Sequence, residues 1–305
     1  MNAEQKPEFW RWTESAWSDP GLAWGTARCI TAGVDVGSVS SQAVLAADGR
    51  ILAYSNLRTG GDSSGSARRA LAAALKVADM PESRVDCCVG TGYGRVNVPF
   101  AQRTITEIAC HARGANYLYG PDVRTVLDIG GQDIKCIRCD GNGKVTNFLM
   151  NDKCAAGTGR GMEVFADLLG VPVTEVGDRS FEFKGAEPAA VTSTCVVYAK
   201  SEAIGLLRRG WSREEVLAAY CQAMADRIFA LVKRIGVEPG LAVTGGMAKN
   251  RGVMDRLMRR IGIERMQTAW DTQIAGAAGA ALFAHALCCG AGRKQSPQLF
   301  KSPLP

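Results

Sequence analysis

The spacing of hydrophobic and polar residues changes along the chain and predicts alternating strands and helices. The first three strand-like runs, separated by Gly-Ser and Asp-Gly turns, cover residues 30–38, 40–48 and 49–57. Apolar residues at helical spacing then predict a helix over 64–79, and a short apolar run ending in glycines predicts a buried strand over 85–92. A helical pattern over 104–115 completes this part of the chain.

The same series then starts again. Three further strand-like runs cover residues 125–133, 134–141 and 144–152. Helices are predicted near 158–169, 196–209 and 212–235, and the last of them opens with the capping box Ser212-x-x-Glu215. A strand over 241–246 and helices over 249–261 and 272–289 follow. Because the order β-β-β-α-β occurs twice, the chain is predicted to be an internally duplicated α/β protein with two related lobes.

Composition excludes several classes of protein. Hydrophobic residues make up 47% and charged residues 22% of 305 residues, which is typical of a globular chain large enough for two lobes. The net charge of +6 is spread out rather than blocked, so nucleic-acid binding is not favoured. No run of eighteen apolar residues predicts a membrane span, and the N-terminus lacks the apolar region of a secretory signal. We therefore expect a cytoplasmic protein.

The two ends differ from the rest of the chain. Residues 1–28 contain four of the six tryptophans, Trp10, Trp12, Trp17 and Trp24, among polar residues. This composition predicts an extension that lies over a surface, and the sequence does not distinguish the chain's own surface from that of a partner. The proline-containing tail, residues 291–305, is expected to be flexible.

The eleven cysteines form an odd set in a chain without an export signal, so a disulfide framework is not favoured. Most are expected to pack as small hydrophobic side chains. Cys136 and Cys139 form a Cys-x-x-Cys pair within a predicted strand, where residues three apart point to opposite faces. No second such pair accompanies them, so zinc binding there is not favoured.

Three strands end in glycine-rich turns that could hold phosphate. These turns are Val34–Ser38, Leu127–Asp133 and Val243–Met247. Glycines let backbone N–H groups approach anionic oxygens without interference from a Cβ atom. Asp35 and Asp128 add a carboxylate to the first two turns, suited to Mg²⁺ that keeps part of its water shell. Each turn is a weak signal by itself, but three of them on duplicated units favour a nucleotide site.

Cys154 and Cys195 each stand directly before a predicted helix. A helix N-terminus lowers the pKa of a thiol, so both residues suit thiolate ligation. Two thiolates supply half of the four that an iron–sulfur cluster usually needs, and a second chain related by a twofold axis could supply the others. From the residues alone, two buried helix-capping cysteines are the more common interpretation of this pattern.

These motifs, in this order, resemble those of the acetate and sugar kinase, heat-shock chaperone and actin superfamily of ATPases. The resemblance implies two ribonuclease-H-like lobes, each βββαβα, with an ATP cleft between them; the lobes would be residues 29–120 and 121–290. It implies that Asp35 and Asp128 act with Mg²⁺ and that Glu107 positions the attacking water, although Glu107 could equally be a solvated helix residue. The implied ATP-binding residues are Gly37, Ser38, Ser40, Ser41, Gly130, Gly131, Gln132, Gly245, Gly246 and Asn250. Residues 92–95 and 275–279 match the segments that connect the lobes.

Segments 151–160 and 193–202 look like the cluster-binding segments of one branch of this superfamily. That branch contains the activators of 2-hydroxyacyl-CoA dehydratases and the ATP-binding subunits of benzoyl-CoA reductase. The match covers residues 29–290. Segments 97–115 and 159–166 look more like benzoyl-CoA reductase, and the length resembles that of the shorter of its two ATP-binding subunits.

The resemblance implies an ATP-hydrolysing electron-activation subunit of benzoyl-CoA reductase, acting in anaerobic aromatic degradation. Reduced ferredoxin would load a [4Fe-4S] cluster held by Cys154, Cys195 and their counterparts in a longer homologous ATP-binding subunit. ATP hydrolysis would move the helices after both cysteines and drive the electron to two catalytic iron–sulfur subunits. One departure is Ser41-Gln42, where activators often carry Ser-Lys, and it leaves the phosphate contacts of this hairpin open.

Three other functions remain possible from the sequence. A homodimeric activator of a 2-hydroxyacyl-CoA dehydratase would use the same chemistry with another client. A small-molecule kinase of the same superfamily would carry no iron and would need a substrate base in the cleft. A filament or interaction protein of the actin type is disfavoured by Asp35, Asp128 and the two cysteines.

Overall fold

The computed structural model describes residues 7–151, 157–192 and 195–290. The first of its two sheets has the strand order β1-β4-β3-β2-β5-β6. Its strands are β1 (Ser15–Ser18), β2 (Ile30–Val36), β3 (Ser40–Ala47), β4 (Arg50–Arg58), β5 (Cys87–Thr91) and β6 (Arg103–Thr104). β2, β3 and β4 form antiparallel hairpins, and β5 runs parallel to β2. Helix α1 (Ser63–Val77), capped by Asp62, packs its alanine and leucine face on this sheet.

The second sheet repeats this arrangement. Its strands are β7 (Thr125–Ile129), β8 (Ile134–Cys139), β9 (Val145–Asn151) and β10 (Leu241–Thr244), in the order β10-β7-β8-β9. β7, β8 and β9 are antiparallel neighbours, and β10 runs parallel to β7, as β5 does to β2. The predicted α/β fold with two duplicated lobes is therefore confirmed.

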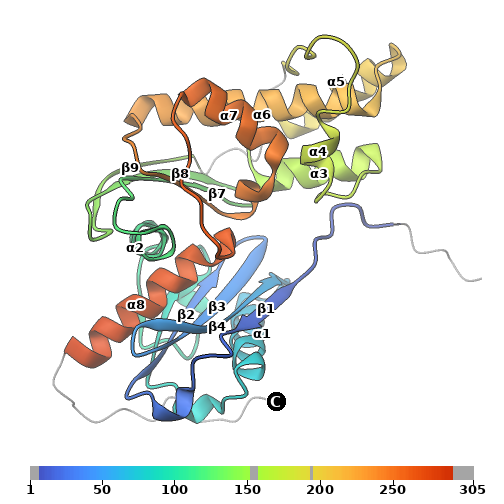
Figure 1. Ribbon diagram of the computed structural model, residues 1–305. Coiled ribbons are helices and arrows are strands. Elements are labelled where there is room, and N and C mark those ends of the chain that lie inside the picture. The colour runs from blue at the N-terminus through green and yellow to red at the C-terminus, as the bar shows by residue number, and fades with distance from the viewer. Residues whose placement is uncertain (1–6, 152–156, 193–194, 291–305) are drawn as a thin grey trace, which may run out of the picture.

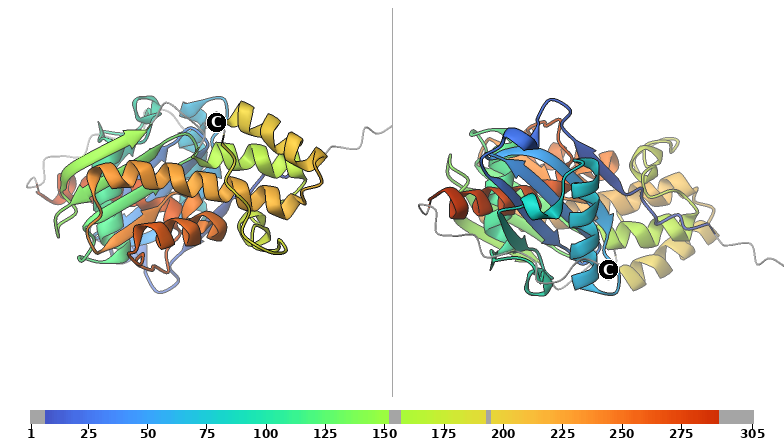
Figure 2. Two further views of the ribbon diagram at one scale, coloured as in Figure 1. Left: turned by 90° about the horizontal axis from the view of Figure 1, so that it is seen from above. Right: turned by 90° about the horizontal axis from the view of Figure 1, so that it is seen from below.

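Five helices belong to the second lobe, which is the upper one in Figure 1. They are α3 (Gly159–Leu169), α4 (Val176–Arg179), α5 (Val196–Arg208), α6 (Arg213–Ile235) and α7 (Arg251–Ile261). The predicted capping box of α6 is present, because Ser212 and Glu215 each accept a hydrogen bond from the other's backbone N–H. Seen from above, α6 runs as one long helix across this lobe (Figure 2).

Helices α2 (Glu107–Tyr119) and α8 (Ala275–Gly290) cross between the two sheets. α2 follows the first sheet in the chain, yet its Ala112 and Ala115 pack among side chains of the second sheet. α8 follows the second sheet and packs against β2, β3 and β5 of the first. Helix α8, which belongs to the expected lobe of residues 121–290, therefore packs on the first sheet instead of the second.

Several boundaries differ from the pattern, and capping side chains explain two of them. The helix expected over 104–115 begins at Glu107, because Thr106 caps it and residues 103–104 form β6. The helix expected from 249 begins at Arg251 because Asn250 caps it. Short 3-10 turns cover Trp24–Thr26, Glu82–Arg84, Arg95–Asn97, Gly246–Lys249 and Thr272–Ile274.

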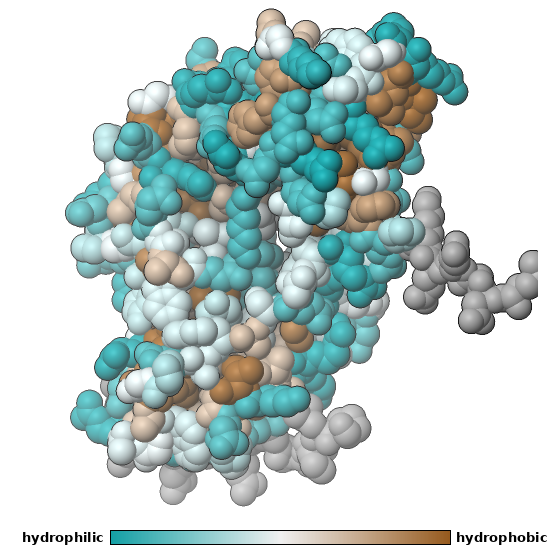
Figure 3. Space-filling model, turned by 45° about the vertical axis from the view of Figure 1, so that its right-hand side comes forward, coloured by the Kyte–Doolittle hydropathy of each residue, from teal (hydrophilic) through white to brown (hydrophobic). Residues whose placement is uncertain are grey.

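The N-terminal extension packs on the protein's own first lobe, where β1 pairs with β4. Hydrophobic side chains on the face in Figure 3 lie in small groups rather than as one continuous surface. No helix within the described residues is long and apolar enough to cross a membrane.

Close packing at the α2–α8 crossing depends on glycine, and Gly279→Ala tests it. A Cβ atom on Gly279 would lie 1.9 Å from the carbonyl oxygen of Cys110, whereas one on Gly205 of α5 would meet nothing within 4 Å. We expect Gly279→Ala to lower the free energy of unfolding by about 1–3 kcal/mol through overpacking. Gly205→Ala should raise it by up to about 1 kcal/mol through helix propensity. Thermal unfolding of both variants checks this, and equal effects would contradict it.

Candidate functional site

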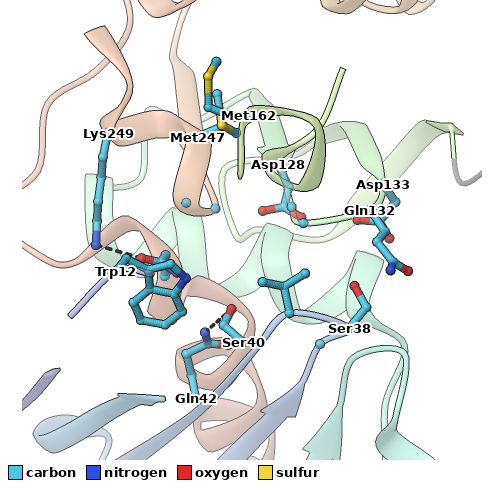
Figure 4. A pocket seen from close by; sticks show the side chains of 18 of the residues that line it. Trp12, Ser38, Ser40, Gln42, Asp128, Gln132, Asp133, Met162, Met247 and Lys249 are labelled. Carbon is cyan, nitrogen blue, oxygen red and sulfur yellow. Dashed lines mark hydrogen bonds between the residues drawn. The ribbon is translucent and has the colours of Figure 1, made fainter. Parts of the chain in front are cut away.

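A cavity of about 680 Å³ lies between the two lobes and is lined by residues of both. Its walls come from the β2–β3 and β7–β8 hairpins, the start of α2, the start of α3 and the turn after β10. Residues 12 and 13 of the N-terminal extension also line it. Figure 4 shows a close view of this cavity. Its position matches the cleft that the sequence predicts.

The first two glycine turns have the same geometry, as expected of a duplication. In the β2–β3 hairpin the N–H of Gly37 donates to the carbonyl of Ser40, at 3.0 Å. In the β7–β8 hairpin the N–H of Gly130 donates to the carbonyl of Asp133, also at 3.0 Å. The turns lie against each other, because a Cβ atom on Gly131 would come within 2.4 Å of the Val39 side chain. Two equivalent backbone turns therefore face one cavity from opposite lobes.

Asp35 and Asp128, at the ends of β2 and β7, both contact one histidine. Nε2 of His111 on α2 lies 3.6 Å from Oδ2 of Asp35, and its Nδ1 lies 3.4 Å from Oδ1 of Asp128. All three residues are buried. Thr244, at the end of β10, donates a hydrogen bond to the same Oδ1 of Asp128, at 2.8 Å. The carboxylates of the two lobes are thus held together by a side chain of the crossing helix.

Lys135 of β8 is the second basic side chain of this cluster. Its Nζ lies 2.8 Å from Asp133, 3.3 Å from Asp128 and 3.6 Å from Glu107, and the residue is only 2% exposed. Burial would lower the pKa of Lys135, but these three carboxylates raise it above its ordinary value. The amine therefore stays protonated while it lines the cavity.

The two aspartates have opposite pKa shifts although both are buried. Burial raises the pKa of Asp35 to about 6, and the nearby charge of His111 opposes this only in part. Burial also acts to raise the pKa of Asp128, but His111, Lys135 and the Thr244 hydrogen bond together hold it below its ordinary value. The difference arises because Lys135 and Thr244 contact Asp128 directly.

Most predicted site residues lie together around this cavity. Those that line it are Asp35, Gly37, Ser38, Ser40, Glu107, Asp128, Gly130, Gly131, Gln132, Gly245, Gly246 and Asn250. Ser41 does not line it, because alternation along β3 turns its side chain to the other face, where it hydrogen-bonds Thr59. Gln42 does line it and donates hydrogen bonds to Ser40 and Asn56.

The cysteines separate into two kinds. Cys195 caps the start of α5 and is the only exposed one among the cysteines that the structure describes, whereas Cys154 lies outside the described residues. Burial raises the pKa of Cys110 and Cys136 to about 12 and that of Cys221 to about 11. Those buried thiols are packed rather than reactive.

Sequence reasoning missed His111, Lys135 and the N-terminal residue Trp12 as parts of the site. His111 stands one helical turn after Glu107, so the spacing i, i+4 on a predicted helix could have placed both on one face. Lys135 follows the second glycine turn by a few residues on a strand. Trp12 carries no local signal, because only tertiary folding brings it to the cavity.

The residues present fit a Mg²⁺–nucleotide complex. Four carboxylates, Asp35, Asp128, Asp133 and Glu107, face two cationic or ionisable side chains, His111 and Lys135. Nδ1 of His111 is buried without a hydrogen-bond partner. Within the described ranges no three His, Cys, Asp or Glu side chains are grouped to hold a metal ion. Mg²⁺ would therefore take its remaining ligands from water and phosphate, as it usually does.

Comparison with known proteins agrees with this geometry. The sequence model of the BadF/BadG/BcrA/BcrD ATPase family matches residues 32–284. The (R)-2-hydroxyglutaryl-CoA dehydratase activating ATPase of Acidaminococcus fermentans is 40% identical over 84% of this chain and 96% of that protein. A subunit of the benzoyl-CoA reductase of Thauera aromatica is 34% identical over 87% of this chain and 98% of its own.

Solved structures agree as well. The activator of the 2-hydroxyisocaproyl-CoA dehydratase from Clostridium difficile, solved with bound ADPNP, has a TM-score of 0.80 and 37% identity. The match covers 88% of this chain and 100% of the activator chain. The ethanolamine utilization protein EutJ of Carboxydothermus hydrogenoformans, at 17% identity and a TM-score of 0.54, shares the fold.

The buried Asp35 makes a prediction about stability and pH. Its pKa is about 6 in the folded protein against an ordinary 3.8, so the folded state binds the proton more tightly than the unfolded state. Its contribution to stability therefore falls as pH rises between these values, and above pH 6 a buried carboxylate costs about 3 kcal/mol. We expect Asp35→Asn to raise the free energy of unfolding of the nucleotide-free protein. The increase should be about 1 kcal/mol larger at pH 8 than at pH 5.

Denaturant unfolding of both proteins at the two pH values measures this difference. Asp140→Asn is the control with the opposite sign, because backbone hydrogen bonds from Lys144 and Asn142 lower the pKa of Asp140. That variant should lose stability to the same extent at pH 5 and at pH 8, because both values lie above the ordinary pKa of 3.8 and the contribution of this carboxylate is lost only as pH falls below that value. If Asp35→Asn raises the free energy of unfolding by the same amount at both pH values, the raised pKa of Asp35 is contradicted.

Proposed function

The chain belongs to the BadF/BadG/BcrA/BcrD ATPase family, and from this premise we propose that it is an ATP-hydrolysing activator that delivers electrons to a 2-hydroxyacyl-CoA dehydratase. The observation that carries the proposal is the meeting of both Asp-containing glycine turns in one cavity, where the turn of the second lobe is hydrogen-bonded to the start of α3. Cys154 precedes that helix by a few residues.

The choice between a dehydratase and a benzoyl-CoA reductase as the enzyme that receives the electrons rests on the similarity of the chain to its relatives. The sequence motifs favour a benzoyl-CoA reductase subunit, with a dehydratase activator as the alternative. Two activators of 2-hydroxyacyl-CoA dehydratases, from Clostridioides difficile and Acidaminococcus fermentans, are 39% and 40% identical to the chain, and the reductase subunit is 34% identical. The comparisons therefore favour the alternative. The reductase remains the second candidate, because its alignment covers 87% of the chain against 83% and 84% for the two activators.

The nucleotide would lie across both lobes. The turns at Gly37–Ser40 and Gly130–Gln132 would face its phosphates, and Gly245, Gly246 and Asn250 would face its adenosine. Asp35 and Asp128 would hold Mg²⁺ through bound water. Lys135 would offset the negative charge of the phosphates, because the first hairpin carries the neutral Gln42 and cannot do so. Glu107 would orient the attacking water, since it lines the cavity on the same helix face as His111.

A direct path of backbone hydrogen bonds leads from the phosphate turn to α3. The N–H of Gly159 donates to the carbonyl of Gly130 at 3.0 Å, and the N–H of Arg160 donates to that of Gly131 at 2.8 Å. Glu163, one turn further along α3, forms an ion pair across the cleft with Arg58 of β4. A change in the turn on ATP hydrolysis would therefore move the start of α3 and the segment that carries Cys154.

Cys154 and Cys195 would hold a [4Fe-4S] cluster together with two thiolates of a partner, which is a second copy in the activator proposal. When bound, the cluster supplies a one-electron carrier that reduced ferredoxin could load. Exposed Val197 and Tyr198 stand beside Cys195 at the start of α5, which supports a protein contact there. In the reductase alternative the partner would be a longer homologous subunit.

One anoxic experiment separates these functions. The full chain is purified without oxygen from its host, its iron is assayed, and activation of 2-hydroxyacyl-CoA dehydratase is measured with ATP and a reductant. We expect an iron-containing dimer that activates the dehydratase, and Cys195→Ser should lose both iron and activation. Cys139→Ser is the matched control, because a hydroxyl can replace the buried thiol that contacts the Val123 carbonyl.

Other outcomes would contradict the proposal. Recovery with a longer homologous ATPase and two catalytic iron–sulfur subunits would favour benzoyl-CoA reductase. Iron-free protein, with oxygen excluded throughout, would overturn the cluster and leave a small-molecule kinase.

The role of Glu107 is tested by Glu107→Gln. Loss of the carboxylate should lower kcat for ATP hydrolysis by about a hundredfold while KM for ATP stays within about threefold, as expected for a group that acts on the attacking water. Glu175→Gln, at an exposed ion pair with Arg179, is the control and should leave both constants unchanged. Steady-state kinetics of both variants decide, and unchanged kcat in Glu107→Gln would mean that this residue is only a solvated helix residue.

A further inference from the structure

The N-terminal segment Phe9–Trp17 is attached to both lobes, and two of its residues line the cavity between them. At one end, β1 is paired with β4 of the first sheet. At the other end, the carbonyl of Phe9 accepts a hydrogen bond of 2.8 Å from the N–H of Val173, and its ring lies 3.7 Å from where a Cβ atom of Gly170 would be. Figure 1 shows this segment rising from β1 along the side of the molecule toward the second lobe.

Arg58 fixes the middle of the segment. Its guanidinium lies over the ring of Trp10 at 4.4 Å and near that of Trp12 at 5.7 Å. Its backbone N–H donates to Glu14 at 2.8 Å, and its side chain reaches Glu163 of α3 at 3.3 Å. One residue at the end of β4 thus binds both the segment and the second lobe.

Trp12 and Thr13 form part of the cavity wall. In Figure 4 the Trp12 ring lies toward Gln42 and Lys249 and away from Gln132 and Asp133 of the phosphate turn. The ring is therefore placed at the nucleoside end rather than the phosphate end. An indole face packs well on a nucleobase, and such stacking tolerates a partly wet site.

The family match begins at residue 32, so this segment lies outside the part of the chain that the family shares. The contact of this segment with the cavity therefore comes from residues outside the matched family region.

We propose that Phe9–Trp17 is part of the nucleotide site, with the Trp12 indole packed against the adenosine of ATP. The inference rests on the proposed ATP-binding function and adds a residue and a linkage to it. Because the segment bridges the lobes, nucleotide binding strengthens its attachment to Val173, and its attachment strengthens nucleotide binding by the same factor.

The test uses the full chain with Trp12→Ala, Trp12→Phe and Trp24→Ala. Calorimetry measures the Kd of a non-hydrolysable ATP analogue and of Mg²⁺–tripolyphosphate, which has no adenosine. We expect Trp12→Ala to weaken the analogue about tenfold, and Trp12→Phe less than about threefold because a ring remains. Tripolyphosphate binding should not change. Trp24→Ala is the matched control, since Trp24 lies outside the segment, contacts Arg84 and does not line the cavity.

Hydrogen exchange at the Val173 amide provides a second measurement. Saturating analogue should slow its exchange about fivefold in the wild-type protein and clearly less in Trp12→Ala. Equal affinity of Trp12→Ala and wild type for the analogue would overturn the inference and leave the proposed function intact. Equal losses for the analogue and tripolyphosphate would also overturn it, because they indicate a structural role. Failure of the wild-type protein to bind the analogue would overturn the proposed function as well.

Discussion

The contact of Asp35 and Asp128 with the two nitrogens of one histidine is the constraint on which the site depends. Two buried carboxylates from different sheets repel each other in a medium of low dielectric constant, so holding them close requires basic side chains that face them. His111 lies between them, and Lys135 holds Asp128 from the other side. Both duplicated turns are thereby fixed at one point, which is where a Mg²⁺–nucleotide complex would need them.

The crossing of α2 and α8 makes this contact possible. Each helix follows one sheet in the chain and packs on the other, and glycines at the crossing let the two backbones approach closely. His111 and Glu107 both come from α2, so a shift of this helix would change the aspartate contacts and the position of Glu107 together. Charge in the cavity and the relative position of the lobes are thus physically linked.

Two connections carry this linkage away from the cavity. The backbone hydrogen bonds from Gly159 and Arg160 to the second glycine turn lead to α3 and the segment of Cys154. The ion pair of Arg58 with Glu163 leads to the N-terminal segment and Trp12. Both connections end on α3. In the proposed function, the nucleotide, the N-terminal segment and the segment of Cys154 would therefore be linked through this one helix.

Most of the helices and strands and the duplication could be predicted from the amino-acid sequence, whereas β1, β6 and α4 were not, and the resemblance to the ATPase superfamily predicted most of the cavity wall. Hydrophobic periodicity and glycine-rich turns are local properties, so they placed Asp35, Asp128 and the three turns correctly without reference to distant residues. Capping side chains such as Thr106 and Asn250 moved helix starts by two or three residues, because a hydrogen bond to the first turn outweighs the apolar pattern.

Other features could not be predicted in this way. The return of α8 to the first sheet, the turn of the Ser41 side chain away from the cavity and the contact of Lys135 with three carboxylates all required the folded protein. The same is true of Trp12, which lines the cavity because the N-terminal segment is attached to both lobes. These outcomes depend on which surfaces meet after folding, and a pattern along the chain does not contain that information.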